Sequence, residues 1–100
     1  MNEEYVVNHM DEDYVAKNLN EEIIDLYLDD CMAKSGMCQC NRCRADVRAF
    51  ALNQLPAHYV VTKMGYVYTR LQSMNPQNQA DVVTAIMKGI QLVKDRPRHD

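Results

Sequence analysis

Residues 31–59, CMAKSGMCQCNRCRADVRAFALNQLPAHY, hold all the cysteines of this chain within their first half. They are Cys31, Cys38, Cys40 and Cys43, in the spacing C-x6-C-x-C-x2-C. A C-x2-C pair such as Cys40 and Cys43 can place two thiolates on one tetrahedral zinc ion, with Zn–S bonds of about 2.3 Å. The other two cysteines would close the tetrahedron and leave no position for water or substrate. The spacing therefore predicts a structural Zn²⁺ site made by all four cysteines.

Other chemistries also use clustered thiols. Two disulfides would close only short loops and would need an oxidising compartment. A redox switch at Cys40 and Cys43 is typical of a thioredoxin-like βαβ pattern, which does not surround them here. An iron–sulfur cluster takes four cysteines too, although this spacing matches none of the usual cluster runs. Four buried free thiols are the simplest alternative. We favour zinc, and zinc and iron–sulfur remain alternatives on spacing alone.

Length and composition indicate one small domain over residues 1–100. The chain has no apolar run near the roughly 20 residues of a membrane span, and its acidic start lacks the pattern of a signal peptide. We therefore expect a cytoplasmic protein without a membrane span. A core of this size stabilises a fold only weakly, so a metal ion or a partner subunit is expected.

Enzyme motifs do not occur in the chain: there is no G-x-S-x-G, H-E-x-x-H or P-loop. His9, His58 and His99 lie far from the cysteines in sequence, and we interpret them as surface or interface residues. The sequence shows no nucleophile with its base and no open metal position, so we expect a protein that is not an enzyme.

Charge is distributed unevenly along the chain. Residues 1–30 contain ten acidic residues against Lys17 alone, a net charge of −9, whereas residues 31–100 contain four acidic and ten basic residues, a net charge of +6. This asymmetry predicts an acidic helix that packs against a basic remainder, or an anion site in the basic part. Because the whole protein is acidic, direct binding of duplex DNA is not expected.

The periodicity of apolar residues predicts a mainly α fold (small α+β). One long helix is favoured from Tyr5 to about Leu28, with two helices that divide near residues 17–20 as the alternative, and Gly36 is expected at the C-terminal end. A second helix should run from Asn41 to Leu55 before Pro56, and a last one from Asn75-Pro76 to Pro97. Between them, residues 58–62 and 66–71 have the pattern of a short β-hairpin, which would pack on the helices or pair across a dimer.

Several motifs resemble the late competence development protein ComFB family. They are NEEYVVNHM at the start, the clustered cysteines with C-x2-C-R-x-D-V-x-A-x-A-L-N-x-L-P, the following YVVT, and the segment from Val82 to His99 that ends KDRPRH. The resemblance covers nearly the whole chain, and residues 40–62 are its most specific part. It implies a mostly helical zinc-bound homodimer without catalytic activity, which serves bacterial competence (DNA uptake and transformation) and has a protein partner from the competence operon.

A second function is implied by the same resemblance, because some members of the family are described as cyclic dinucleotide receptors. The matching residues here are Arg44 and Arg48 for the phosphates, and the turn from Leu55-Pro56 to Tyr59 for the base. Many members of the family have a second proline after the first, where this chain has Ala57. We therefore expect the turn to be less rigid here. The alternative role of Arg44 and Arg48 is to pair with the acidic first helix.

Overall fold

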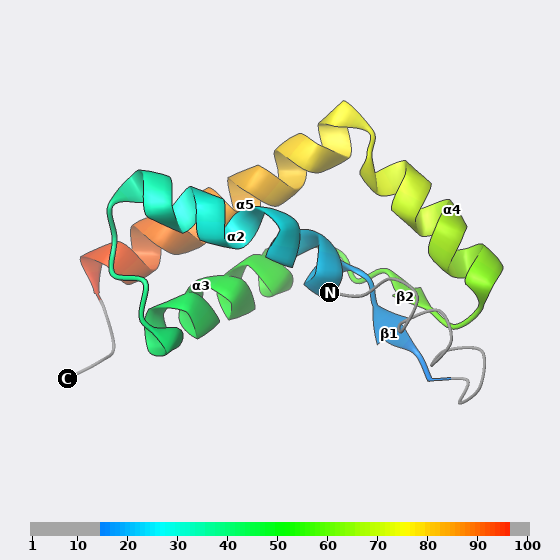
Figure 1. Cartoon of the computed structure of the whole chain (residues 1–100), viewed down its shortest axis with the longest axis horizontal. Coiled ribbons are helices and arrows are strands. Elements are labelled where there is room, and N and C mark those ends of the chain that lie inside the picture. The colour runs from blue at the N-terminus through cyan, green and yellow to red at the C-terminus, as the bar shows by residue number, and fades with distance from the viewer. Residues whose placement is uncertain (1–14, 97–100) are drawn as a thin grey trace.

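Four helices and two short strands make up residues 15–96, which are the residues that this computed structural model describes (Figure 1). In chain order they are β1 (Lys17–Asn18), α2 (Asn20–Ser35), α3 (Asn41–Gln54), β2 (Tyr59–Val60), α4 (Lys63–Ser73) and α5 (Pro76–Asp95). The strands form one antiparallel sheet, in the register Lys17 to Val60 and Asn18 to Tyr59. The predicted mainly helical fold with a short two-stranded sheet is confirmed.

The core lies between α2, α3 and α5, which contact one another along their lengths. Its largest fully buried side chains come from all three helices: Ile24, Leu28, Met32, Cys43, Val47 and Ile86. In Figure 1, α4 extends away from these three helices, and it is joined to them by its junction with α5 and by contacts of Tyr66 and Arg70 with Glu22 of α2. The molecule thus has a three-helix body and a projecting helix.

The helix ends follow the predicted signals. Helix α2 ends at Gly36, which has φ 75°, the left-handed conformation that glycine adopts without strain. Helix α5 begins after Asn75, whose Oδ1 accepts a hydrogen bond from the backbone N–H of Gln77 at 2.8 Å, and Pro76 occupies its first turn. Helix α3 stops just before Leu55 and Pro56. Local sequence fixes these boundaries.

The predicted hairpin is wrong in its second strand. Residues 63–73 form α4, and the hydroxyl of Thr62 caps this helix by accepting a hydrogen bond from the backbone N–H of Gly65 at 3.1 Å. The first predicted strand contains β2, but β2 pairs with β1 from far earlier in the chain. Alternating aromatic and β-branched residues favoured a strand here, and tertiary contacts of Tyr66 and Arg70 on one face of the helix override that propensity.

The favoured single first helix is wrong near residues 17–20, where the alternative placed a division. β1 occupies that region, and α2 begins only at Asn20. Asn18 ends the strand: its Oδ1 accepts hydrogen bonds from the backbone N–H groups of Asn20 at 3.2 Å and His58 at 3.1 Å. The part of the predicted helix before Val15 lies outside the described residues. Among residues 15–96 no helix has both the length and the apolar character needed to cross a bilayer.

Candidate metal centre

Three of the four cysteines come together where the α2–α3 loop enters α3. The sulfur atoms of Cys38, Cys40 and Cys43 all lie within 4.8 Å of one another. A zinc ion with Zn–S bonds of about 2.3 Å needs sulfur atoms roughly 3.8 Å apart, so these three thiols fit one face of a zinc tetrahedron after small rotations of their side chains. The donor set is all sulfur, which suits zinc or another thiophilic metal.

The start of α3 fixes the geometry of this cluster. Cys40 is the N-cap of α3, and its Sγ accepts a hydrogen bond from the backbone N–H of Cys43 at 3.4 Å. This N–H lowers the pKa of the Cys40 thiol, and hydrogen bonds from Cys38 and Cys43 act in the same direction. The lowered pKa favours the thiolate form of Cys40, which is the form that binds a metal ion.

Cys43 has the opposite character. Its side chain is 1% exposed, and this burial raises the pKa of its thiol to about 12, with hydrogen bonds to Cys40 and Cys38 adding to the effect. Without a metal, Cys43 stays protonated at neutral pH. A bound metal ion would have to displace that proton, so metal binding at this site is coupled to proton release.

Cys31 lies outside the cluster of three. It belongs to the C-terminal part of α2, is half-buried, and packs against the hydrophobic core. Burial raises the pKa of its thiol, and the neighbouring Asp30 carboxylate raises it further. The structure thus assembles Cys38, Cys40 and Cys43 and leaves Cys31 on the adjoining helix.

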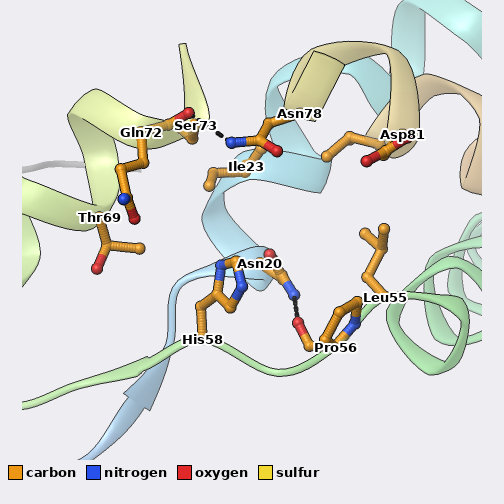
Figure 2. A pocket seen from close by; sticks show the side chains of 11 residues that line it. Asn20, Ile23, Leu55, Pro56, His58, Thr69, Gln72, Ser73, Asn78 and Asp81 are labelled. Carbon is orange, nitrogen blue, oxygen red and sulfur yellow. Dashed lines mark hydrogen bonds between the residues drawn. The ribbon is translucent and has the colours of Figure 1, made fainter. Parts of the chain in front are cut away.

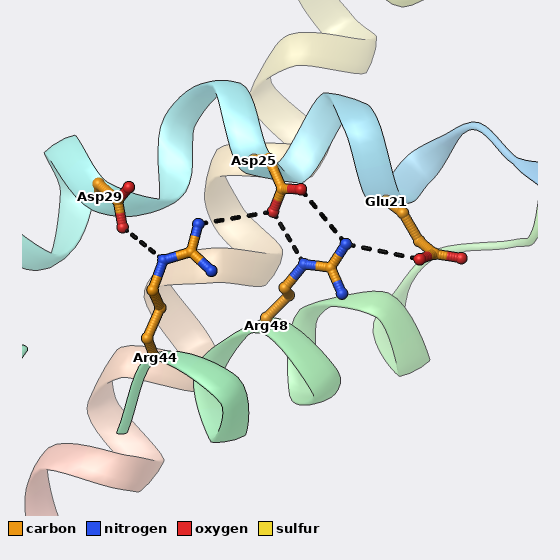
Figure 3. A network of polar contacts seen from close by, with 5 residues as sticks. All are labelled: Glu21, Asp25, Asp29, Arg44 and Arg48. Atoms are coloured by element: carbon orange, nitrogen blue, oxygen red, sulfur yellow. Dashed lines mark hydrogen bonds and ion pairs between the residues drawn. The ribbon is translucent and has the colours of Figure 1, made fainter. Parts of the chain in front are cut away.

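Arg44 and Arg48 face the acidic side of α2 (Figure 3). The Nε of Arg48 donates to Asp25 at 2.8 Å, and its Nη2 reaches the other oxygen of Asp25 at 3.3 Å and Glu21 at 3.5 Å. The Nε of Arg44 donates to Asp29 at 2.7 Å. These contacts confirm the predicted pairing of the acidic helix with the basic part of the chain, and they give both arginines carboxylate partners.

Pro56 and Tyr59 lie apart from the two arginines. Pro56 lines a cavity of about 150 Å³ where the start of α2, the α3–β2 connection, α4 and α5 meet (Figure 2). Asn20 closes one side of this cavity by donating from Nδ2 to the carbonyl of Pro56 at 2.7 Å, and the exposed His58 lies on the same wall. Tyr59 is 66% exposed and does not line the cavity. The four residues predicted to bind a ligand are thus divided among separate surfaces.

The sequence analysis missed a buried polar cluster between α2 and α4. Glu22 is 4% exposed, and its two carboxylate oxygens accept from the hydroxyl of Tyr66 at 3.2 and 3.0 Å. The Nε of Arg70 lies 3.3 Å from the same carboxylate as an ion pair. The four-residue spacing of Tyr66 and Arg70, which places both on one helical face, was the available signal.

Taken together, the fold and the cluster define a small helical protein with three thiols that could hold a metal ion where the α2–α3 loop enters α3. The family model for late competence development protein ComFB matches residues 17–97, and the chain belongs to this family. Its structure is similar to that of the late competence protein ComFB from Bacillus subtilis, with a TM-score of 0.73 and 25% sequence identity over 83% of this chain and 92% of that one. No curated protein matches the chain.

Proposed function

We propose that this chain is a zinc-binding, non-enzymatic accessory protein of bacterial competence, which acts as a single-domain cytoplasmic homodimer through a protein partner. The observation that carries the proposal is the sulfur cluster of Cys38, Cys40 and Cys43 at the start of α3, in a chain of the competence family. An all-cysteine zinc site supplies structure and offers no open position for a substrate. The cysteines of residues 15–96 are free thiols, which suits a reducing compartment.

The proposed zinc site has Cys31 as its fourth ligand. Cys31 sits on the last turns of α2 and the other three thiols lie on the next connection and helix, so a shared ion would join the end of α2 to the start of α3. Elemental analysis of the purified chain should give about one zinc per chain. Competition with a chromophoric chelator should show the largest loss of affinity for Cys43→Ser and a loss at Cys31→Ser as well.

A matched control is available beside the cluster. Ala33 lies on the same helix end as Cys31, is exposed and has no sulfur, so Ala33→Ser should leave zinc affinity unchanged. If Cys31→Ser binds zinc as tightly as the unaltered chain, Cys31 is not a ligand. If the unaltered chain contains no metal after purification without chelators, the zinc proposal fails.

The competence role has a cellular test. Deletion of the gene from its host should reduce the number of transformants obtained with added DNA, and a plasmid copy should restore it. A copy with Cys38→Ser and Cys40→Ser should restore it less well, because its metal site is disabled. Unchanged transformation in the deletion strain would contradict the proposal.

Cyclic dinucleotide binding ranks second. It is supported by the hollow beside α3 that Asn41, Arg44 and Arg48 line. Binding there would require both arginines to exchange carboxylate partners for phosphate, and Asp25 would add negative charge beside the ligand. Calorimetric titration with cyclic di-GMP and cyclic di-AMP tests it: heat that disappears in Arg44→Ala and Arg48→Ala supports a receptor, and no heat at high ligand concentration excludes one.

A further inference from the structure

Helix α4 presents a stripe of large apolar side chains to solvent. The stripe consists of Met64, Val67, Tyr68, Leu71 and Met74, which are 76%, 47%, 64%, 64% and 61% exposed. Positions 64, 67, 71 and 74 follow the alternating three- and four-residue spacing of a helix–helix seam. Because α4 projects from the three-helix body (Figure 1), this stripe lies on an accessible flank of the molecule.

The polar side of α4 is the side that faces the protein. Tyr66 is 4% exposed and donates to the buried Glu22, and Arg70 forms an ion pair with the same carboxylate. A surface helix of a monomer normally buries its apolar stripe and exposes its polar side. α4 does the reverse, and a buried polar cluster holds it in that orientation. This arrangement is typical of a helix whose apolar stripe contacts another chain.

The charges of α4 indicate which chain that is. Its two charged residues are Lys63, at its first position, and Arg70, which turns toward Glu22. The stripe between them carries no charge, so it can face a copy of itself without like-charge repulsion, as a two-fold symmetric contact requires. An anionic surface such as nucleic acid or a lipid headgroup would call for basic residues along the stripe.

We infer that α4 is the seam through which two copies of this chain pair, with the two α4 helices antiparallel across a two-fold axis. Antiparallel packing aligns the helix dipoles favourably. With the seam spacing, Met64 lies opposite Met74 of the second copy, and Val67 lies opposite Leu71 of the second copy. This inference rests on the homodimer proposed above and assigns its interface.

Sedimentation velocity of the full-length, zinc-loaded chain over a range of concentrations tests the interface. Leu71→Glu should weaken dimerisation by about 100-fold or more, because each copy contributes one such leucine to a desolvated seam. Leu26→Glu and Leu92→Glu are matched controls, since these leucines are 54% and 50% exposed on α2 and α5. Both controls should remain dimeric, and circular dichroism should show native helicity in all three variants.

A charge exchange tests the antiparallel register. Met64→Lys and Met74→Glu should each weaken the dimer, and the double variant should regain much of the lost affinity, because each lysine would then face a glutamate of the second copy. Residues 64 and 74 are about 15 Å apart along one helix, so the two charges do not pair within one chain. Rescue therefore reports contact between copies.

The outcomes separate this inference from the dimer on which it rests. A monomeric unaltered chain overturns both. A dimer that survives Leu71→Glu, or that is lost in Leu92→Glu, overturns the α4 interface and leaves the homodimer standing. Single charges that break the dimer without rescue in the double variant overturn the antiparallel seam.

Discussion

Gly89 allows α3 and α5 to cross at short range. A Cβ atom at this position would lie 3.1 Å from the backbone oxygen of Val47 and 3.2 Å from Cδ1 of Phe50. Alanine normally stabilises a helix by about 1 kcal/mol relative to glycine, but overpacking costs about 1–3 kcal/mol. The clash involves backbone, which yields less easily than a side chain. We therefore expect Gly89→Ala to lower the free energy of unfolding by about 1 kcal/mol in urea denaturation.

Gly65 is the matched glycine for this experiment. It lies in the first turn of α4, and its closest neighbour would be the hydroxyl of the Thr62 side chain at 3.3 Å, with no backbone atom among the nearest contacts. Gly65→Ala should leave stability unchanged or raise it slightly. If both substitutions stabilise the protein to a similar extent, helix propensity decides the outcome and close contact at Gly89 does not.

At the scale of the helix, α4 depends on one buried carboxylate for its attachment to α2. Glu22→Gln keeps the size of the side chain but removes the charge that Arg70 faces. Breaking a buried ion pair lowers the free energy of unfolding by about 3–5 kcal/mol. Because Arg70 is partly exposed, we expect a smaller loss here, about 2 kcal/mol. We expect faster hydrogen–deuterium exchange in α4, with little change in α3.

Glu21→Gln is the control for this experiment, because Glu21 is the neighbouring residue, with a side chain that is 49% exposed and a contact of 3.5 Å to Arg48. Hydrogen–deuterium exchange of α4 in the Glu21→Gln variant should match that of the unaltered chain. Equal protection of α4 in both variants would show that the Glu22 carboxylate does not hold this helix in place.

The two arginines of α3 attach it to α2 with different strength. Arg48 contacts both oxygens of Asp25, with both side chains about a quarter exposed, and this contact raises the pKa of Arg48. Arg44 contacts Asp29, whose side chain is 70% exposed. We expect Arg48→Met to cost about 1 kcal/mol and Arg44→Met about half as much or less.

Urea denaturation at low and high salt checks this difference. Screening weakens ion pairs that solvent reaches, so the cost of Arg48→Met should shrink in 1 M salt while remaining larger than that of Arg44→Met. A double-mutant cycle of Arg48→Met with Asp25→Asn isolates the contribution of the Arg48–Asp25 pair to stability. A coupling energy near zero would contradict the structural role of Arg48.

The sequence predicts where these helices end better than it predicts which other segments they contact. Gly36, Pro56 and Asn75-Pro76 act on the adjacent backbone, so the ends of α2, α3 and α5 follow from local rules. The identity of α4 does not, because its residues suit a strand by propensity and a helix by spacing. The contact of Tyr66 and Arg70 with Glu22, more than 40 positions earlier in the chain, decides in favour of the helix.

For the whole molecule, contacts between distant parts of the chain also limit what the sequence predicts about the candidate site. Close spacing predicted that Cys38, Cys40 and Cys43 would lie together, and they do, because one short loop and the first turn of α3 carry them. Cys31 belongs to another helix, and the number of residues between two cysteines does not specify how a loop folds back. Likewise, the sequence predicted as one alternative that Arg44 and Arg48 pair with the acidic helix, but it did not show that Asp25 is the carboxylate that Arg48 contacts.

Metal removal tests how the whole fold is held together. The core between α2, α3 and α5 consists mainly of apolar side chains, so most helix should survive chelation at low temperature. The proposed zinc site, with Cys31 as its fourth ligand, would join the end of α2 to the start of α3. Its loss should then lower the melting temperature by roughly 10 °C or more, since each kcal/mol shifts the midpoint of a domain of this size by about 4–8 °C. Thermal unfolding followed by circular dichroism, with and without chelator, measures this shift. Restoration by added Zn²⁺ but not Mg²⁺ is expected from an all-sulfur donor set, and a melting temperature unaffected by chelation would show that the fold does not depend on the metal.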